Sequence, residues 1–268
     1  MRGSERCRQI SASVRRGQQP AKRCFVRLIL RDPLLAGRVY IIDDVTAEQA
    51  LAQADAIYEA GQINACIDTV ATLSRALELV DPYTAKHGEV AARLARKIAR
   101  ELGYDELEAQ GVYYGALIHD LGKLSVPVSI LTRPGRLSPA EMNLVRMHPE
   151  MGANIVQHLH FPWPVREIVL QHHERMDGTG YPAGLKGEEI SEAARIVAVA
   201  DVAESMSAHR PYRPALGTEA AIRELVDGRG CRYDARIVDA FLKLVAAGQT
   251  LPEFGGDSDN RTIAGDVG

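Results

Sequence analysis

The feature that most constrains the fold is a series of helix start signals beyond Pro82. "DELE" at 105–108 and "SPAE" at 138–141 are capping boxes, in which the first side chain accepts a hydrogen bond from a backbone N–H three residues on. Pro139 stands at the first helical position, where its missing N–H costs nothing. We therefore expect helices that begin near residues 106 and 139.

Later stop and start signals extend this pattern and predict helices over 191–208, 218–228 and 234–248. Strand patterns disappear beyond Pro82, so we expect an all-α fold. The chain has 268 residues and 46% hydrophobic content, enough for one large core or two modest ones. Its longest apolar runs fall far short of the roughly 18 residues needed to cross a bilayer.

The four cysteines stand far apart without a CxxC pair, which argues against a zinc ribbon or a disulfide framework. This usage fits a reducing compartment, and we expect a cytoplasmic protein. The formal net charge of −3 is uneven, because residues 1–38 carry ten Lys and Arg against Glu5 and Asp32. We interpret 1–38 as a basic, disordered arm rather than a tail for nucleic acid or a membrane surface.

Residues 39–62 read as a short β-branched strand that runs into a helix, which Gly61 is expected to close. The stretch "RVYIIDDVTAEQALAQADAIYEAG" resembles the last strand and exit helix of a PAS sensor domain, although a complete sensor needs more chain than is present before it. After it, apolar residues recur at steps of three and four over 63–80: Ile63, Cys66, Val70, Leu73, Leu77 and Val80. This seam fits two alternatives equally, a homodimer through 63–80 or packing on its own domain.

Several histidines and carboxylates are expected on buried helix faces. His87 lies on an apolar stripe, where a single histidine is usually a core residue with both nitrogens hydrogen-bonded. His119 and Asp120 close the apolar helix "GALIHDLGK", and Asp201 ends the run "ARIVAVAD". Because a buried ionised carboxylate is costly unless it is paired or coordinates a metal, two of them indicate a cation.

Three further histidines stand at predicted helix ends. His148 ends the helix that starts at Ser138, and His172 and His173 end "VREIVLQHH". Nitrogen and carboxylate ligands without thiolate suit iron, manganese or zinc rather than calcium. Two such ions side by side are a common arrangement for phosphoester hydrolysis. The neighbouring Glu174 lies in the same polar stretch, and local sequence alone does not assign its role.

The order of these motifs carries a family resemblance. "HDLGK", then His148, then "HHERMDGTGYPAGLKGEEI", "ARIVAVAD" and "HRPYRPA" resemble the HD-GYP family over residues 67–245. The family consists of bacterial metal-dependent phosphodiesterases of cyclic di-GMP. The resemblance implies an HD-type helical bundle as the catalytic domain, placed at 63–250, with a flexible tail at 251–268.

The resemblance also implies roles for single residues. The first metal would be held by His87, His119, Asp120 and Asp201, and the second by Asp120, His148, His172 and His173. Lys123 would face the scissile phosphate, and Tyr181 would touch the substrate beside Gly180, where a glycine allows close backbone approach. Arg210 and Arg213 would clamp the second phosphate, for which a planar guanidinium is well suited.

The chain departs from the family pattern at two places. After the ligand position Asp201, many members have an aromatic residue and an aspartate. This chain departs from them in "DVAESM". Tyr83 replaces a glutamate found in members with a third metal, and a phenol with a pKa near 10 is a poor ligand at neutral pH. We therefore expect two divalent ions, with iron or manganese favoured.

The function expected from these residues is hydrolysis of cyclic di-GMP to pGpG, and the sequence leaves open whether hydrolysis continues to GMP. One alternative is an HD hydrolase of another cyclic nucleotide, such as cyclic GMP-AMP, and another is a non-catalytic cyclic di-GMP receptor. The remaining histidines are expected at the surface or in loops: His158, His160 and His209. Trp163 is expected to be a packing anchor, with stacking on guanine as the alternative.

Overall fold

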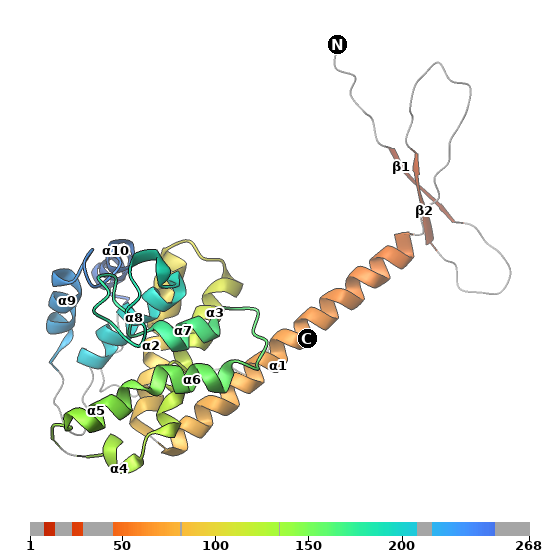
Figure 1. Ribbon diagram of the computed structural model, residues 1–268. Coiled ribbons are helices and arrows are strands. Elements are labelled where there is room, and N and C mark those ends of the chain that lie inside the picture. The colour runs from red at the N-terminus through yellow and green to blue at the C-terminus, as the bar shows by residue number, and fades with distance from the viewer. Residues whose placement is uncertain are drawn as a thin grey trace. The chain divides into compact units, whose positions relative to one another are not determined.

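The computed structural model describes residues 8–13, 23–28, 45–80, 82–133, 135–207 and 216–249. The chain divides into two compact units, Met1–Asn64 and Ala65–Gly268, and each is described by itself. Helices make up most of the described residues, which confirms the all-α class (Figure 1). The strand predicted just before residue 44 and the tail at 251–268 lie outside the described residues.

The first unit contains two strands that the sequence analysis did not predict. β1 (Arg8–Ser13) pairs antiparallel with β2 (Arg23–Leu28), and Ile10 lies opposite Val26. The expectation that residues 1–38 lack regular structure is therefore wrong for these two segments. The physical reason is that β1 alternates polar residues with Ile10 and Ala12, whereas β2 contains the run "CFV" with an aromatic and a β-branched residue, and both patterns are typical of strands.

Helix α1 (Val45–Val80) runs through Gly61 without interruption, so the expected stop at this glycine is wrong. Gly61 does not adopt the positive φ that a glycine stop requires. A glycine inside a helix costs only about 1 kcal/mol relative to alanine, which the long run of helix-forming residues around it offsets. Farther along, Val70 and Leu77 are buried, so this part of the seam packs on the chain itself.

The second unit continues from α1 with a series of short and medium helices. They are α2 (Pro82–Glu101), α3 (Glu106–Leu117), η1 (Leu121–Ser125), α4 (Val128–Leu131), α5 (Pro139–Arg146), α6 (His148–Val156), α7 (Val165–Gln171), η2 (Gly187–Glu189), α8 (Glu192–Ser207), α9 (Thr218–Asp227) and α10 (Ala235–Ala246). These bounds confirm the three later helices predicted from the sequence to within two residues at each end.

Both predicted capping boxes are present. Asp105 caps α3 and Ser138 caps α5, and in each case the glutamate three residues on bonds back to the backbone N–H of the capping residue. Pro139 is the first residue of α5, as expected. Capping of this kind stabilises a helix by about 1 kcal/mol and fixes where it begins.

The core of the second unit forms where α2 and α8 pack against each other and against α3, α9 and α10 (Figure 1). α2 contributes Ile98, and α8 contributes Ile196 and Val197, all fully buried. Truncating such an isoleucine to alanine costs about 2–5 kcal/mol. α8 is buried over most of its length, so Asp201, which is 8% exposed, stands in largely apolar surroundings.

Within the described parts of the chain, we find no helix with the length and apolar character needed to cross a membrane. A cytoplasmic location stays a prediction.

Candidate metal centre

Seven of the predicted ligands converge inside the second unit. Five of them stand where helices end or begin: His119 and Asp120 follow α3, His148 opens α6, and His172 and His173 follow α7. The other two, His87 and Asp201, lie within α2 and α8. The close packing of α2 with α8, and of α6 with η1 and α7, brings these positions together (Figure 1).

The first group of candidate ligands comprises His87, His119 and Asp201, all of them buried. His87 Nε2 lies 2.9 Å from Asp201 Oδ1, and His119 Nε2 lies 3.9 Å from the same oxygen. One ligand atom from each residue falls within 4.8 Å of the others, which is a separation that one ion can span.

The second group comprises Asp120, His148, His172 and His173. Asp120 Oδ1 lies 3.2 Å from His148 Nε2, and His148 Nε2 lies 3.1 Å from His172 Nε2. The other oxygen of Asp120, Oδ2, lies 3.4 Å from His119 Nε2 of the first group. The Asp120 carboxylate therefore faces both groups at once.

Backbone carbonyls fix the tautomer of three of these histidines. His119, His148 and His172 each place Nδ1 against the carbonyl three residues earlier, at 2.6, 2.8 and 2.9 Å. A carbonyl oxygen can only accept, so Nδ1 carries the proton and Nε2 presents a lone pair. The Nε2 lone pair of each of these three histidines is thereby available to a metal ion.

The pair of Nε2 atoms on His148 and His172 tests whether the residues fit a metal. Two lone pairs that face each other at 3.1 Å repel unless a cation lies beside both. Metal–nitrogen bonds of about 2.0–2.1 Å place two ligands of one ion about 3.0–3.4 Å apart at angles near 90–110°. The donor set and its spacing therefore fit a divalent metal ion.

Electrostatics keep the two aspartates ionised. Burial alone would raise the pKa of Asp120, but Lys123, whose Nζ lies 2.6 Å away, and neighbouring histidines hold it well below its usual range. Burial would also raise the pKa of Asp201, and hydrogen bonding to His87 holds it low instead. Both carboxylates are therefore anionic at neutral pH.

The histidines are mostly neutral, as metal ligands must be. Burial lowers the pKa of His119, holds that of His172 well below its usual range, and lowers that of His173 to about 3. His87 differs: burial would lower its pKa, but hydrogen bonds to Asp201 and Glu204 raise it to about 9.

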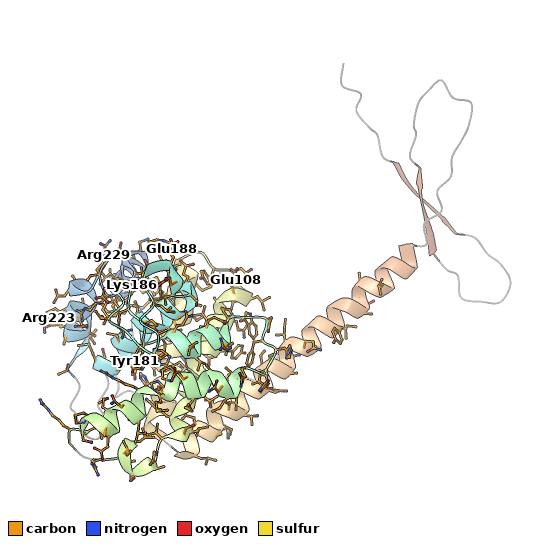
Figure 2. The ribbon with its side chains drawn as sticks, viewed as in Figure 1. Glu108, Tyr181, Lys186, Glu188, Arg223 and Arg229 are labelled. Atoms are coloured by element: carbon orange, nitrogen blue, oxygen red, sulfur yellow. The ribbon has the colours of Figure 1, made fainter. Side chains whose placement is uncertain are left out.

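The loop between α7 and α8 stands over the second group (Figure 2 labels Tyr181). The Tyr181 ring stacks on His173 with centroids 4.7 Å apart, and the Arg146 guanidinium lies 5.4 Å from the same ring. A Cβ on Gly180 would overlap the backbone of Glu174 and Arg175, so only glycine allows the loop to approach this closely.

A model of the HD domain family matches residues 71–237, well over half of the chain. The chain belongs to the HD domain family.

Two relatives are named for the cyclic dinucleotide that they cleave. The cyclic di-GMP phosphodiesterase response regulator RpfG of Xanthomonas campestris is 40% identical over 178 residues, which is 66% of this chain and 47% of RpfG. The 3'3'-cGAMP-specific phosphodiesterase 3 of Vibrio cholerae is 34% identical over 184 residues, 69% of this chain and 39% of that protein. The chain thus spans less than half the length of either relative. These matches confirm the resemblance drawn from the motifs.

Among solved structures, an HDG"Y"P protein from Bdellovibrio bacteriovorus superposes with a TM-score of 0.54 at 23% identity. The superposition covers 72% of this chain and 68% of that protein. At this identity the likeness supports the HD fold alone.

The remaining residues named in the sequence analysis differ in what the structure shows of them. Arg210, Arg213 and His209 lie outside the described residues, so their roles stay predictions. His158 and His160 are exposed, as expected of surface residues. Trp163 is buried against Gly111, which confirms the packing anchor.

Sequence reasoning missed two residues around the centre and left the role of a third, Glu174, open. Glu204 is buried and contacts His87 Nδ1. Its position one turn after Asp201 on an apolar helix is a signal that could have found it. Glu174 is buried and shapes the loop, whereas Arg146 reaches the Tyr181 ring from the turn before His148. Only the tertiary structure brings these last two into place.

Proposed function

We propose that this chain is a metal-dependent phosphodiesterase that hydrolyses cyclic di-GMP to linear pGpG. The observation that carries the proposal is the Asp120 carboxylate, whose two oxygens face two separate groups of metal-ligating side chains. A shared carboxylate is what a pair of adjacent ions requires, and pairs of ions are a common device for cleaving phosphoesters.

In this proposal, two divalent cations, when bound, would polarise the attacking water and stabilise charge on the leaving oxygen. The protein's own groups would do the rest. Lys123, only partly buried and 2.6 Å from Asp120, would offset negative charge that develops on the phosphate. Tyr181 would stack on a guanine base, and the Arg146 guanidinium beside it would bind a phosphate oxygen.

The proposal includes two ions, of iron or manganese. Imidazole and carboxylate suit both metals, and no thiolate belongs to either group. Tyr83 lies in the first turn of α2, one turn before His87, where a glutamate would provide a further ligand. A phenol does not ionise at neutral pH, which favours two ions over three.

The relatives support cyclic di-GMP as the substrate and also provide the second candidate. RpfG is named for cyclic di-GMP, whereas the Vibrio cholerae relative is named for 3'3'-cGAMP. The two nucleotides differ in one base, so the base-contacting residues around Tyr181 would decide between them. A receptor that binds without cleaving is the third candidate, and the full set of ligands speaks against it.

A nucleotide panel tests these candidates directly. We would purify the chain anaerobically, measure its metal content, and follow cyclic di-GMP, 3'3'-cGAMP and cyclic di-AMP by product chromatography. The proposal requires about two ions per chain and the fastest cleavage for cyclic di-GMP. Faster cleavage of 3'3'-cGAMP would favour the second candidate, and tight binding of cyclic di-GMP without any product would favour the receptor.

We place the phosphodiesterase domain at 63–250, which agrees with the family match over 71–237 and with the compact unit that starts at Ala65. Burial of Val70 and Leu77 favours packing of the seam on its own domain over a homodimer. Light scattering on the full chain would decide between the two, since a dimer at micromolar concentration would restore the other alternative.

A further inference from the structure

Four of the five histidines of the candidate centre are held in two different ways. His119, His148 and His172 each donate from Nδ1 to a carbonyl in the last turn of the preceding helix. Carbonyls in the last turn of a helix lack the regular N–H partner four residues on, so each can accept from a side chain as well. Position at a helix end therefore gives each of these three rings a backbone partner for Nδ1.

His87 cannot use the same device, because it lies inside α2. Interior carbonyls of a helix are already bonded to the N–H four residues ahead. His87 instead contacts Glu204 Oε2 through Nδ1 and Asp201 Oδ1 through Nε2. Both carboxylates belong to α8 and stand one turn apart, so a single helix holds both nitrogens of the ring.

We propose that Glu204 is a positioning residue that holds His87 as a metal ligand and strengthens its bond to the ion of the first group. The inference rests on the metal centre of the proposed function. A carboxylate behind a ligating histidine fixes the ring and raises its basicity more than a neutral carbonyl does. His87 thus has a charged partner where the other three rings have neutral ones.

The surroundings of Glu204 argue against a purely structural role. Its side chain is 1% exposed, and burying a carboxylate is costly unless its oxygens are satisfied. Within the described residues, its Oε1 has no hydrogen-bond partner, so Oε2 and His87 carry the interaction. A glutamate retained only for packing would be replaced at lower cost by an uncharged side chain of similar volume.

Substituting Glu204 by Gln separates charge from shape. Glu204→Gln keeps the volume and an acceptor oxygen but removes the negative charge behind His87. Glu204→Asp keeps the charge on a side chain one methylene shorter. A packing role predicts that Gln substitutes better than Asp, whereas the positioning role predicts that Asp substitutes better than Gln.

The matched control lies on the same helix. Glu192 accepts from Tyr104 and Arg236 at 3.0 and 3.1 Å, near the other end of α8. Twelve residues of helix separate it from Glu204, about 18 Å at the rise of an α-helix. Glu192→Gln removes the same charge from the same helix without touching His87.

The test measures Mn²⁺ binding to the metal-stripped full chain by calorimetry and by electron paramagnetic resonance. We expect two ions for the wild type and for Glu192→Gln. In Glu204→Gln, one of the two ions should bind about 10–100-fold more weakly, and Glu204→Asp should fall between. Because the defect acts through the ion, excess Mn²⁺ should restore kcat in Glu204→Gln, which it would not do for a misfolded chain.

Three results would overturn the inference or its basis. Equal Mn²⁺ affinity in Glu204→Gln and wild type would remove the positioning role while leaving the proposed function intact. If Glu204→Gln fails to fold, the uncharged Glu204→Met, of similar volume, is measured in its place, and unchanged Mn²⁺ affinity in that variant does the same. A wild type that binds no Mn²⁺ would instead refute the metal centre itself, and the inference with it.

Discussion

The metal centre and the loop between α7 and α8 both bury carboxylates, but they satisfy them differently. Glu174 in the loop accepts three backbone N–H groups, from Ala183 and Gly184 at 2.7 and 3.2 Å and from Leu185 at 3.1 Å. Asp120 in the centre faces the side chains of a lysine and two histidines.

The difference distinguishes a carboxylate that stabilises a loop, Glu174, from one that is a candidate metal ligand, Asp120. The three backbone N–H groups belong to one short segment, so the Glu174 carboxylate fixes the conformation of its loop. Both of its oxygens already accept hydrogen bonds, which leaves few lone pairs for a metal or substrate. The partners of Asp120 come from separate elements and include neutral histidines whose lone pairs need a cation. A buried carboxylate surrounded by backbone donors is structural, whereas one surrounded by ligating side chains is a candidate site.

The strongest way to break this comparison is Asp120→Ala. Removing the shared carboxylate leaves both ligand groups short of a ligand, so we expect loss of both ions and turnover at background. Leaving the buried partners uncompensated should also lower the free energy of unfolding by about 3–5 kcal/mol. Elemental analysis and product chromatography measure the first two effects, and urea unfolding the third.

The matched control for that change is Asp177→Ala in the loop, where Asp177 accepts from the backbone and hydroxyl of Thr179. It should keep its metal. Full metal occupancy with near-normal activity in Asp120→Ala would show that the carboxylate is not shared.

Metal removal gives the next largest effect. Added Mn²⁺ at 100 times its Kd should stabilise metal-stripped protein by about 2.7 kcal/mol per ion. For a domain of this size that corresponds to a rise in Tm of about 5–10 °C. Differential scanning calorimetry measures it, and Mg²⁺ provides the comparison, because it prefers oxygen ligands to imidazole. An equal rise with Mg²⁺ would contradict the histidine-based site.

A smaller effect is expected from Glu174→Gln, which tests the structural half of the comparison. The amide keeps one acceptor oxygen but turns an NH₂ toward a backbone N–H, so we expect a loss of about 2 kcal/mol in the free energy of unfolding. Metal content should not change. Urea unfolding and elemental analysis check both statements, and loss of an ion in this variant would show that Glu174 belongs to the centre.

The smallest effect is expected from Arg146→Ala. The Arg146 guanidinium lies over the Tyr181 ring and should contact the substrate equally in the ground and transition states. Its loss should therefore raise KM about tenfold, which corresponds to about 1.4 kcal/mol, and leave kcat unchanged. Steady-state kinetics on cyclic di-GMP measures this, and a small generic phosphodiester should show no change. Arg229→Ala is the control, since Arg229 pairs with Asp239 at the surface (Figure 2). A large loss of kcat on both substrates would place Arg146 at the chemistry.

Local signals allowed much of the second unit to be predicted. Asp105 and Ser138 act through hydrogen bonds within four residues, so the starts of α3 and α5 could be read from the sequence. The candidate ligands His119, His148, His172 and His173 were recognisable because helix ends are also local features. The family order of motifs then supplied which of them belong together.

What could not be predicted depends on contacts between distant segments or on weak local preferences. Glu174 and Asp177 look alike in sequence, and only the folded loop gives one a buried place and the other a turn at the surface. Gly61 is a stop signal whose energy is too small to end a helix of 36 residues. Arg146 reaches Tyr181 across 35 positions of sequence, which no periodicity reveals.

The contact between η1 and α6 bears on how inactive copies of such a domain could arise. A Cβ on Gly122 would overlap the carbonyl of His148 and the backbone of Gly152, so any other residue there must push η1 and α6 apart. That displacement would separate Asp120 from His148 although both side chains are still encoded. A gene could therefore encode every candidate ligand and still specify a domain that cannot assemble the centre. For this reason the glycine of "HDLGK" is as informative about the centre as the histidine and the aspartate before it.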